Sequence, residues 1–366
     1  MVSCYLLAVS GMENFYTRLC KNCGSALVFD PQKQKLVCPA CGTEYEADEM
    51  KGENVVELDL MDTLKAIEQY NEDDDKLVVH CPNCGADSEF PANVVATHCQ
   101  YCGTPLTGST LSQRTLRPQG IVPFAISHDA AVMAFRKWLQ SLWFLPNKAK
   151  KLKLEETMQG VYRPLWTFDF KTTTRYTGER GEHYYVTKTR RVNGKTETYQ
   201  ERKTRWYPAA GTVHVAFDDI LVPASNRMSK ALQEECRWNL ENAVDYSEDM
   251  IRGFDEESYD VRLRPAFEES QEKAKPQIQS AIRRDIGGDE QRISSMDTSY
   301  ADLSYKLLLV PYWSATYRFK GKPYTYIVNG QTGVAHGERP WSVVKITFLI
   351  LAILAIVIGL YIMFNQ

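Results

Sequence analysis

The feature that most constrains this chain is a repeated cysteine pattern in its first third. Four Cys-x-x-Cys-Gly knuckles occur there, and fourteen residues separate Cys23 from Cys38 and, likewise, Cys84 from Cys99. Two thiolates two residues apart on a tight turn can bind one metal ion, and the glycine that follows accepts the positive φ that closes the turn. The pattern predicts two metal sites, formed by Cys20, Cys23, Cys38 and Cys41 and by Cys81, Cys84, Cys99 and Cys102.

Four thiolates hold Zn²⁺ tetrahedrally in a closed structural site that has no open position for water. We therefore expect two structural zinc ions, in zinc ribbons over residues 15–50 and 77–107 that are joined by a helical linker over residues 51–76. Iron or a redox-active dithiol are the alternatives. Units this small bury too little apolar surface to fold alone, so the metal is expected to supply folding free energy, on the order of 10–16 kcal/mol for structural zinc.

The remaining cysteines and nearby histidines fit this interpretation. The chain has 10 cysteines, and their crowding into metal-knuckle spacing favours a reducing compartment over a disulfide framework. His80 and His98 each precede a knuckle. Because each set already has four thiolates, both are interpreted as solvated neighbours. Cys236 lies on a helical apolar stripe and is interpreted as a small core residue.

The extreme C-terminal segment predicts a membrane span. Ile346 to Phe364 is 19 residues long without a charge. As a helix this segment is about 29 Å long, close to the roughly 30 Å hydrocarbon core of a bilayer. We expect one transmembrane helix over residues 343–364. Arg339, Trp341 and Lys345 lie on its N-terminal flank and no basic residue follows it, so the protein is expected in the cell membrane as a single-pass chain with its bulk in the cytoplasm.

Between these ends, residues 118–340 predict an α+β domain of mixed helices and antiparallel sheet. A helix with Ser127 as its N-cap carries apolar residues at Val132, Phe135, Leu139 and Leu142 and ends before Pro146. Strand-like alternation then runs from Val161 to Val222, with a hairpin turn at Asn193-Gly194. Two more helices are expected, over Met228 to Ala243 and up to Gly287 with a kink at Pro276, before strands resume from Tyr305 to Gly333.

A weak internal echo suggests that this domain is duplicated. VYRPLWTFDF (residues 161–170) and LLVPYWSATYRF (residues 308–319) both place proline two residues before tryptophan, and each follows a predicted helix. The alternative is two edge strands that both start with proline.

Charge and motifs exclude some functions. Up to Thr110 the chain has 7 basic and 17 acidic residues, a net charge of −10, which opposes binding of the ribbons to nucleic acid. No nucleotide-binding loop, zinc-protease motif or nucleophile elbow occurs, so we expect no enzyme. A basic hairpin suits a nucleic-acid backbone, anionic lipid or simple solvation; it carries Lys188, Arg190, Arg191, Lys195, Arg202, Lys203 and Arg205.

Long segments of the sequence resemble a bacterial zinc-ribbon family whose members are often labelled primosomal helicase-like or transcription-factor-type. The segments are the two CxxCG ribbons, IVPFAISHDAAVMAFRKWL, GVYRPLWTFDF, and LLLVPYWSATYRFKGKPYTYIVNGQTGVAHGERPWSVVKI. The helicase label is not supported, because the chain has no nucleotide-binding loop. The resemblance implies instead a membrane anchor encoded with flotillin-like or phage-shock-type proteins, with the eight cysteines as ligands.

Together these observations predict a non-catalytic scaffold that recruits such proteins in an envelope-stress response. The alternative is a membrane-associated zinc-ribbon protein that binds nucleic acid. The sequence leaves open the partner, the oligomeric state, and whether translation starts at Met1 or Met12. It also leaves open the role of the Val328 to Gly333 block, which is expected to be a turn between strands.

Overall fold

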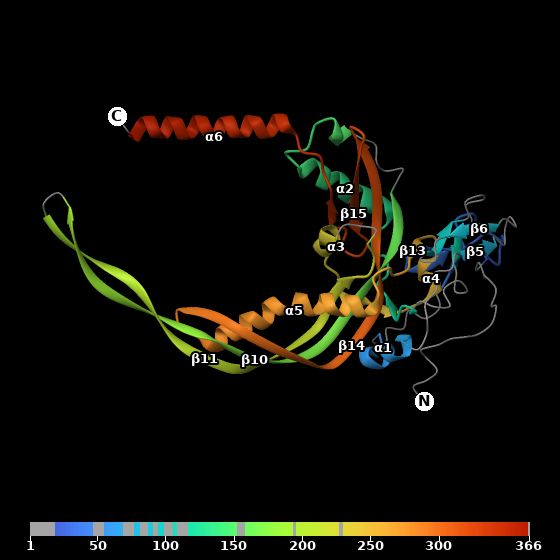
Figure 1. Cartoon of the computed structure of the whole chain (residues 1–366). Coiled ribbons are helices and arrows are strands. Elements are labelled where there is room, and N and C mark those ends of the chain that lie inside the picture. Colours follow the sequence, from blue (N-terminus) through green and yellow to red (C-terminus); the bar gives the residue numbers. More distant parts are fainter. Residues whose placement is uncertain are drawn as a thin grey trace.

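The computed structural model shows a long, bent, mainly antiparallel sheet with helices along it (Figure 1). It describes residues 19–46, 55–68, 77–80, 87–90, 94–98, 105–107, 116–151, 158–192, 195–226 and 230–364. The predicted α+β class, with helices and antiparallel sheet in one body, is confirmed.

Three very long strands form the centre of the sheet. β10 (Gln159–Val192) lies between β11 (Lys195–Pro223) and β14 (Glu290–Phe319) and is antiparallel to both. β15 (Lys322–Asn329) and β16 (Ala335–Gly337) extend the sheet beyond β14. Four short strands join it: β4 (Leu58–Asp59), β9 (Gly120–Ile121), β12 (Val244–Asp245) and β13 (Asp255–Glu257).

The β10–β11 hairpin confirms the alternating pattern seen in the sequence. Its register pairs Val192 with Lys195, and the turn predicted at Asn193-Gly194 lies outside the described residues. The prediction that strands resume at Tyr305 is wrong, because β14 already begins at Glu290. The residues in its first half are mostly polar, and their side chains are exposed or half-buried. Apolar and polar residues therefore alternate little in that part of the sequence.

The helix α5 (Leu263–Ile286) covers the face of β10 and β11, as Figure 1 shows. It ends where predicted, at Gly287, whose φ of 65° is accessible to glycine. The helix continues through Pro276, where the sequence predicts a kink. The side chains that it buries against the sheet are Leu263, Ala266, Ser270, Ala274, Ile278, Ile282 and Ile286.

The helix α2 (His128–Ser141) also confirms its prediction. Ser127 caps it by accepting a hydrogen bond from the amide of Ala130, and Val132, Phe135 and Leu139 are buried against β15 and β16. The helix predicted over Met228 to Ala243 is wrong as a single element. The structure has a short α3 (Lys230–Glu235) and a 3₁₀ turn (Leu240–Asn242), because the Asn239 side chain caps the second piece by accepting from the amide of Glu241.

The two echoing sequence segments lie side by side at the centre of the sheet. Val161 of β10 pairs with Tyr312 of β14, in antiparallel register. Their prolines have matching surroundings: the carbonyl of Pro164 accepts from the amide of Ala224, and that of Pro311 accepts from the amide of Gly330. One unit consists of α2, β10 and β11, and the other consists of α5, β14 and β15, so each has the order helix, strand, strand. The helix α2 packs on β15, and α5 packs on β10 and β11, so each helix packs on the hairpin of the other unit. This symmetry supports the interpretation of a duplicated unit.

The segment between the two cysteine-rich parts contributes to the body. β4 pairs with β14, and α1 (Leu60–Glu68) follows it, inside the span predicted as a helical linker. Leu60 and Leu64 of α1 are buried in the same core as Trp166 and Tyr305, and the hydroxyl of Tyr305 lies 3.2 Å from that of Thr63. Packing of α1 therefore fixes this connection on the sheet.

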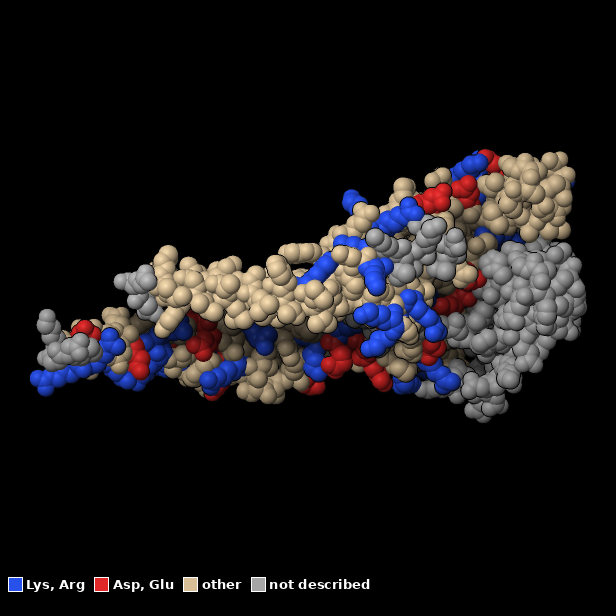
Figure 2. Space-filling view, turned by 90° about the horizontal axis from the view of Figure 1, so that it is seen from above, with Lys and Arg blue, Asp and Glu red and all other residues tan. Residues whose placement is uncertain are grey.

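Beyond the pair Gly181 and Glu290, where β14 starts, the β10–β11 hairpin continues as two strands only. We call residues 182–192 and 195–205 the arm; within the described residues no third strand pairs with it. α6 (Val343–Phe364) is long and apolar enough to cross a membrane, and none of its side chains is buried. α6 and the arm project to the same side of the body (Figures 1 and 2).

Candidate metal centre and its attachment to the sheet

The first pair of knuckles lies at a small three-stranded sheet: Cys38 and Cys41 lie in the connection between its second and third strands, and Cys20 and Cys23 lie just before its first strand, in a turn closed by the bridge between Leu19 and Ala26. The sheet is formed by β1 (Val28–Asp30), β2 (Lys35–Val37) and β3 (Glu44–Tyr45). Gly24 and Gly42 follow the knuckles with φ values of 74° and 73°, and their amides donate to the carbonyls of Cys20 and Cys38. The expected role of these glycines is therefore confirmed, since a side chain at such φ values costs energy.

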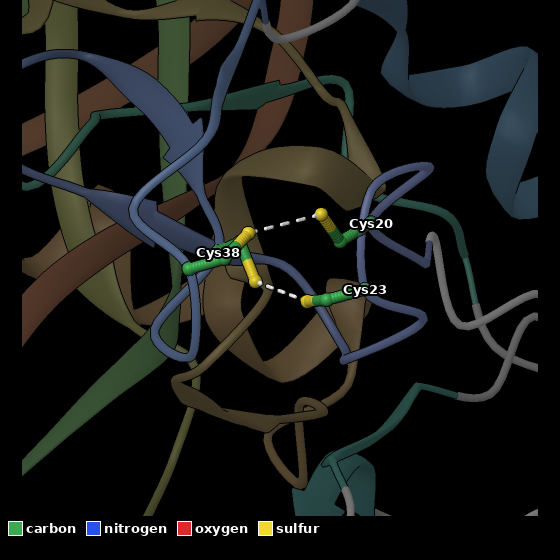
Figure 3. Close-up of side chains that lie close together, drawn as sticks. Cys20, Cys23 and Cys38 are labelled. Carbon is green, nitrogen blue, oxygen red and sulfur yellow. Dashed lines mark hydrogen bonds between the residues drawn. The ribbon is translucent and has the colours of Figure 1, made fainter.

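The four sulfurs of this pair converge on one point. Cys20 Sγ lies 3.5 Å from Cys41 Sγ, and Cys23 Sγ lies 3.4 Å from Cys38 Sγ. All four lie within 4.8 Å of one another, and Figure 3 shows the labelled cysteines facing each other from the two knuckles. A tetrahedral ion with metal–sulfur bonds of 2.3 Å needs sulfurs about 3.8 Å apart. The residues fit a metal ion with four thiolate ligands.

Neighbouring hydroxyl groups prepare two of these thiols to ionise. The hydroxyl of Tyr45 lies 3.3 Å from Cys20 Sγ, and this hydrogen bond lowers the pKa of Cys20 to about 6. The hydroxyl of Thr43 lies 3.1 Å from Cys41 Sγ and lowers the pKa of that thiol. Burial instead raises the pKa of Cys38 to about 11. A bound dication would favour the thiolate form of all four, since its charge lies closest to them.

This ribbon is attached to the sheet by both hydrogen bonds and apolar contacts. The amide of Phe29 donates to the carbonyl of Arg252 (3.0 Å), and Gln34 Nε2 donates to the carbonyl of Phe124 (2.7 Å). Phe29 and Leu36 are buried in the same core cluster as Phe124 and Phe254. The ribbon and the body therefore share one core, which cysteine spacing alone does not indicate.

The second set of cysteines, Cys81, Cys84, Cys99 and Cys102, lies outside the described residues. The strands around it are described. β5 (Leu77–His80) pairs with β6 (Asp87–Phe90), and β7 (Val94–His98) pairs with β8 (Pro105–Thr107), both antiparallel. The described strands β5 and β7 end at His80 and His98, the residues that precede the two knuckles in sequence. β7 also pairs with β13, which joins this part to the main sheet.

A second cluster of potential ligands consists of Asp169, Asp218 and Asp219 beside a bulge in β10. The amine of Lys306 lies 3.1 Å from Asp219 Oδ1 and 3.8 Å from Asp169 Oδ2. Burial raises the pKa of Asp169 to about 6. The amine of Lys306 also lies 3.2 Å from Glu57 Oε1, so this one cation offsets part of the negative charge of the cluster.

The Val328 to Gly333 block forms the turn between β15 and β16, as predicted. Asn329 is buried, and its Oδ1 accepts hydrogen bonds from the amides of Gln331 and Thr332 (2.8 and 2.9 Å). The side chain of Gln331 bonds both the amide and the carbonyl of Asn239. The block therefore holds the connection after α3 against the sheet and has a structural role.

Cys236 is buried in a core cluster of the body, as expected for a small apolar residue. Burial raises the pKa of its thiol to about 12, which leaves it protonated and unreactive.

Comparison with known proteins gives one informative relative. No protein-family model matches the chain, and no solved structure matches it. The chain is similar to YdjG, an uncharacterised protein of Bacillus subtilis (strain 168), with 25% identity over 355 residues. The similarity covers 93% of this chain and 97% of that protein, so it extends over nearly the whole length of both.

Proposed function

We propose that this protein is a non-catalytic scaffold, tail-anchored in the cell membrane by α6, with its bulk in the cytoplasm. Its zinc ribbons and α+β body recruit protein partners to the membrane. From the family resemblance of the sequence, these partners are flotillin-like or phage-shock-type proteins of an envelope-stress response.

The observation that carries this proposal is the exposure of α6. The helix is 22 residues long, and none of its side chains is buried in the body. An apolar surface of this length in water far exceeds the patch of a few hundred Å² that soluble proteins expose. A helix also satisfies its own backbone hydrogen bonds, which allows it to lie in hydrocarbon. A bilayer is the environment that fits this surface.

The chemistry of the two ligand clusters supports a structural role. The four thiolates of Cys20, Cys23, Cys38 and Cys41 complete a tetrahedral shell, which leaves a metal no position for substrate or water. The amine of Lys306 lies 3.1 Å from the carboxylate of Asp219 and 3.8 Å from that of Asp169, so it offsets part of their charge.

The arm offers a docking element for a protein partner. Its two strands pair only with each other among the described residues, so their outer edges present free backbone donors and acceptors. Such edges bind an added strand from a partner. Tyr185 on the arm is 63% exposed, and it supplies apolar area beside these edges.

The arm also limits how α6 enters a bilayer. It projects to the same side of the body as α6 (Figures 1 and 2) and carries charged residues such as Lys188 and Arg191, which hydrocarbon excludes. When α6 spans the membrane, the axis of the helix therefore turns away from the arm, about the residues 338–342 that connect it to β16. The proposal thus includes a change of angle at this connection.

A second candidate function, nucleic-acid binding, is favoured by one face of the arm. The register places Tyr185 opposite Arg202, and Arg191 lies on the same face. Between these positions that face carries threonine and glutamine and no acidic residue. Arginine and tyrosine without a competing carboxylate suit a polyanion.

The experiment that separates these functions is purification of the tagged full chain from its native membrane in mild detergent, before and after nuclease treatment. A stoichiometric protein partner that survives nuclease and modest salt supports the scaffold. Nucleic acid without a protein partner contradicts it and supports the alternative.

Two variants assign the interaction to a region. Cys23→Ser/Cys41→Ser removes ligands of the first ribbon, and the scaffold predicts loss of the partner. Cys236→Ser is the matched control, because this cysteine is buried away from the ribbons. Arg191→Glu/Arg202→Glu reverses charge on the arm, and it abolishes binding only if a polyanion is the ligand.

A further inference from the structure

The start of α6 is surrounded by aromatic side chains from two distant parts of the sequence. Trp143 and Phe144 follow α2, and Trp341 precedes α6. The rings of Trp143 and Phe144 lie 5.6 Å apart, and those of Phe144 and Trp341 lie 6.1 Å apart. Trp143 is 68% exposed and Trp341 is 55% exposed. Large exposed aromatics at the end of an apolar helix are typical of the membrane–water interface.

Lys345 joins these two parts. Its amine, in the first turn of α6, donates to the carbonyls of Trp143 and Leu145 and to Asn147 Oδ1, each at 2.9 Å. The amide of Ser342 also donates to the carbonyl of Phe144 (2.8 Å). The long side chain of a lysine can keep such partners while the helix axis changes direction, since it has four rotatable bonds. The loop after α2 therefore stays at the level where α6 begins.

The same loop is fixed on the body and then becomes basic. Leu142 and Leu145 are buried in the main core cluster, so the loop cannot move far from α2. After Asn147 the chain continues Lys-Ala-Lys-Lys, and Lys148 is exposed. Each basic residue beside a bilayer attracts anionic lipid, and the attraction falls off within a Debye length.

We infer that residues 142–148 form a second membrane-contact element, which inserts Trp143 at the bilayer interface and binds the phosphates of anionic phospholipids through Lys148. The inference rests on the proposed membrane span of α6. A single helix alone leaves the body free to rotate and tilt. A second contact, attached to the core, orients the sheet and the arm relative to the membrane.

The test uses the full chain in nanodiscs whose lipids carry bromine, which quenches tryptophan fluorescence only at close range. We expect Trp143→Phe and Trp341→Phe each to remove part of the quenching. Trp206→Phe is the control, because Trp206 lies on β11 against Arg292 and takes no part in the aromatic contacts at the start of α6, and it should leave the quenching unchanged. Quenching that depends on Trp341 and not on Trp143 overturns the inference and leaves the membrane span intact.

The lipid class is tested by comparing discs of phosphatidylcholine with discs that also contain phosphatidylglycerol. The part of the quenching that depends on Trp143 should increase when the disc contains the anionic lipid, and Lys148→Glu should remove this increase. Lys275→Glu, on the exposed face of α5, should keep it. Equal quenching in both kinds of disc overturns the assignment to anionic lipid. Loss of all quenching, with extraction of the chain by alkaline carbonate, contradicts the membrane span itself.

Discussion

The first cysteine ribbon and the sheet body share one core, yet different forces hold them. In the body, apolar side chains such as Trp166 and Phe168 are fully buried between the sheet and α5. In the ribbon, three strands of two or three residues bury only Leu27, Phe29 and Leu36 besides cysteines. So few apolar residues cannot offset the conformational entropy of the segment. From this difference we propose that metal binding stabilises the ribbon, whereas hydrophobic burial stabilises the sheet.

The largest expected effect is loss of the metal. Cys23→Ser/Cys41→Ser should remove one zinc ion per chain, because two ligands cannot replace four, and with it a binding free energy on the order of 10–16 kcal/mol. Metal content measured by mass spectrometry, together with hydrogen exchange of residues 19–46, checks this. The Cys236→Ser control should keep the metal. An unchanged zinc content in the double variant would contradict the site.

Truncation of a side chain in the core of the body should lower the stability of the fold and leave the metal bound. Trp166 is fully buried, and its Nε1 donates to the carbonyl of Val261 (2.8 Å). Trp166→Ala should lower the free energy of unfolding by about 3–5 kcal/mol, because it leaves a large cavity and an unpaired carbonyl. Denaturant unfolding measures the loss, and the zinc content should not change. A parallel loss of zinc would mean that the two regions fold as one cooperative unit.

The boundary between the two regions is tested at Phe29. Phe29→Ala should cost about 3 kcal/mol, since this ring is buried in the core cluster that contains Phe254. We expect it to affect both readouts: a lower denaturant midpoint and faster transfer of zinc to a chelator. Val56→Ala is a suitable control, because Val56 is 65% exposed. An effect on only one readout would show that the shared core does not couple the regions.

The smallest effect is a pH dependence at the edge where β7 joins the sheet. Burial raises the pKa of Glu256 to about 8, while a hydrogen bond from Tyr246 partly opposes the shift. The folded state then binds a proton that the unfolded state releases above about pH 4.5. Stability should therefore fall as the pH rises from about 4.5 to about 8. In Glu256→Gln this part of the pH dependence should disappear, which unfolding curves between pH 5 and 8 would reveal.

Local patterns predicted much of this fold. The knuckle glycines, the Ser127 cap, the end of α5 at Gly287 and the hairpin of β10 and β11 depend on neighbouring residues, and each lies where expected. The helix α6 was also predictable, because residues 346–364 form one unbroken apolar run.

Long-range contacts account for what the sequence did not show. The first half of β14 is polar, and it is a strand because β10 pairs with it. Phe29 carries no local sign that it packs against the body. Tyr45, which polarises Cys20, lies 25 residues away from it in sequence. Nothing in the sequence near Trp143 indicates that Lys345 will hold its carbonyl.

The claim central to this account is that α6 holds the body at the cytoplasmic face of the membrane. Protease treatment of spheroplasts, with an N-terminal tag on the full chain, tests it most directly. The account predicts that the tagged chain sediments with the membrane and survives protease added outside, and that opening the membrane exposes it to cleavage. A tagged chain that is cleaved from outside, or that stays in the soluble fraction, would contradict the account.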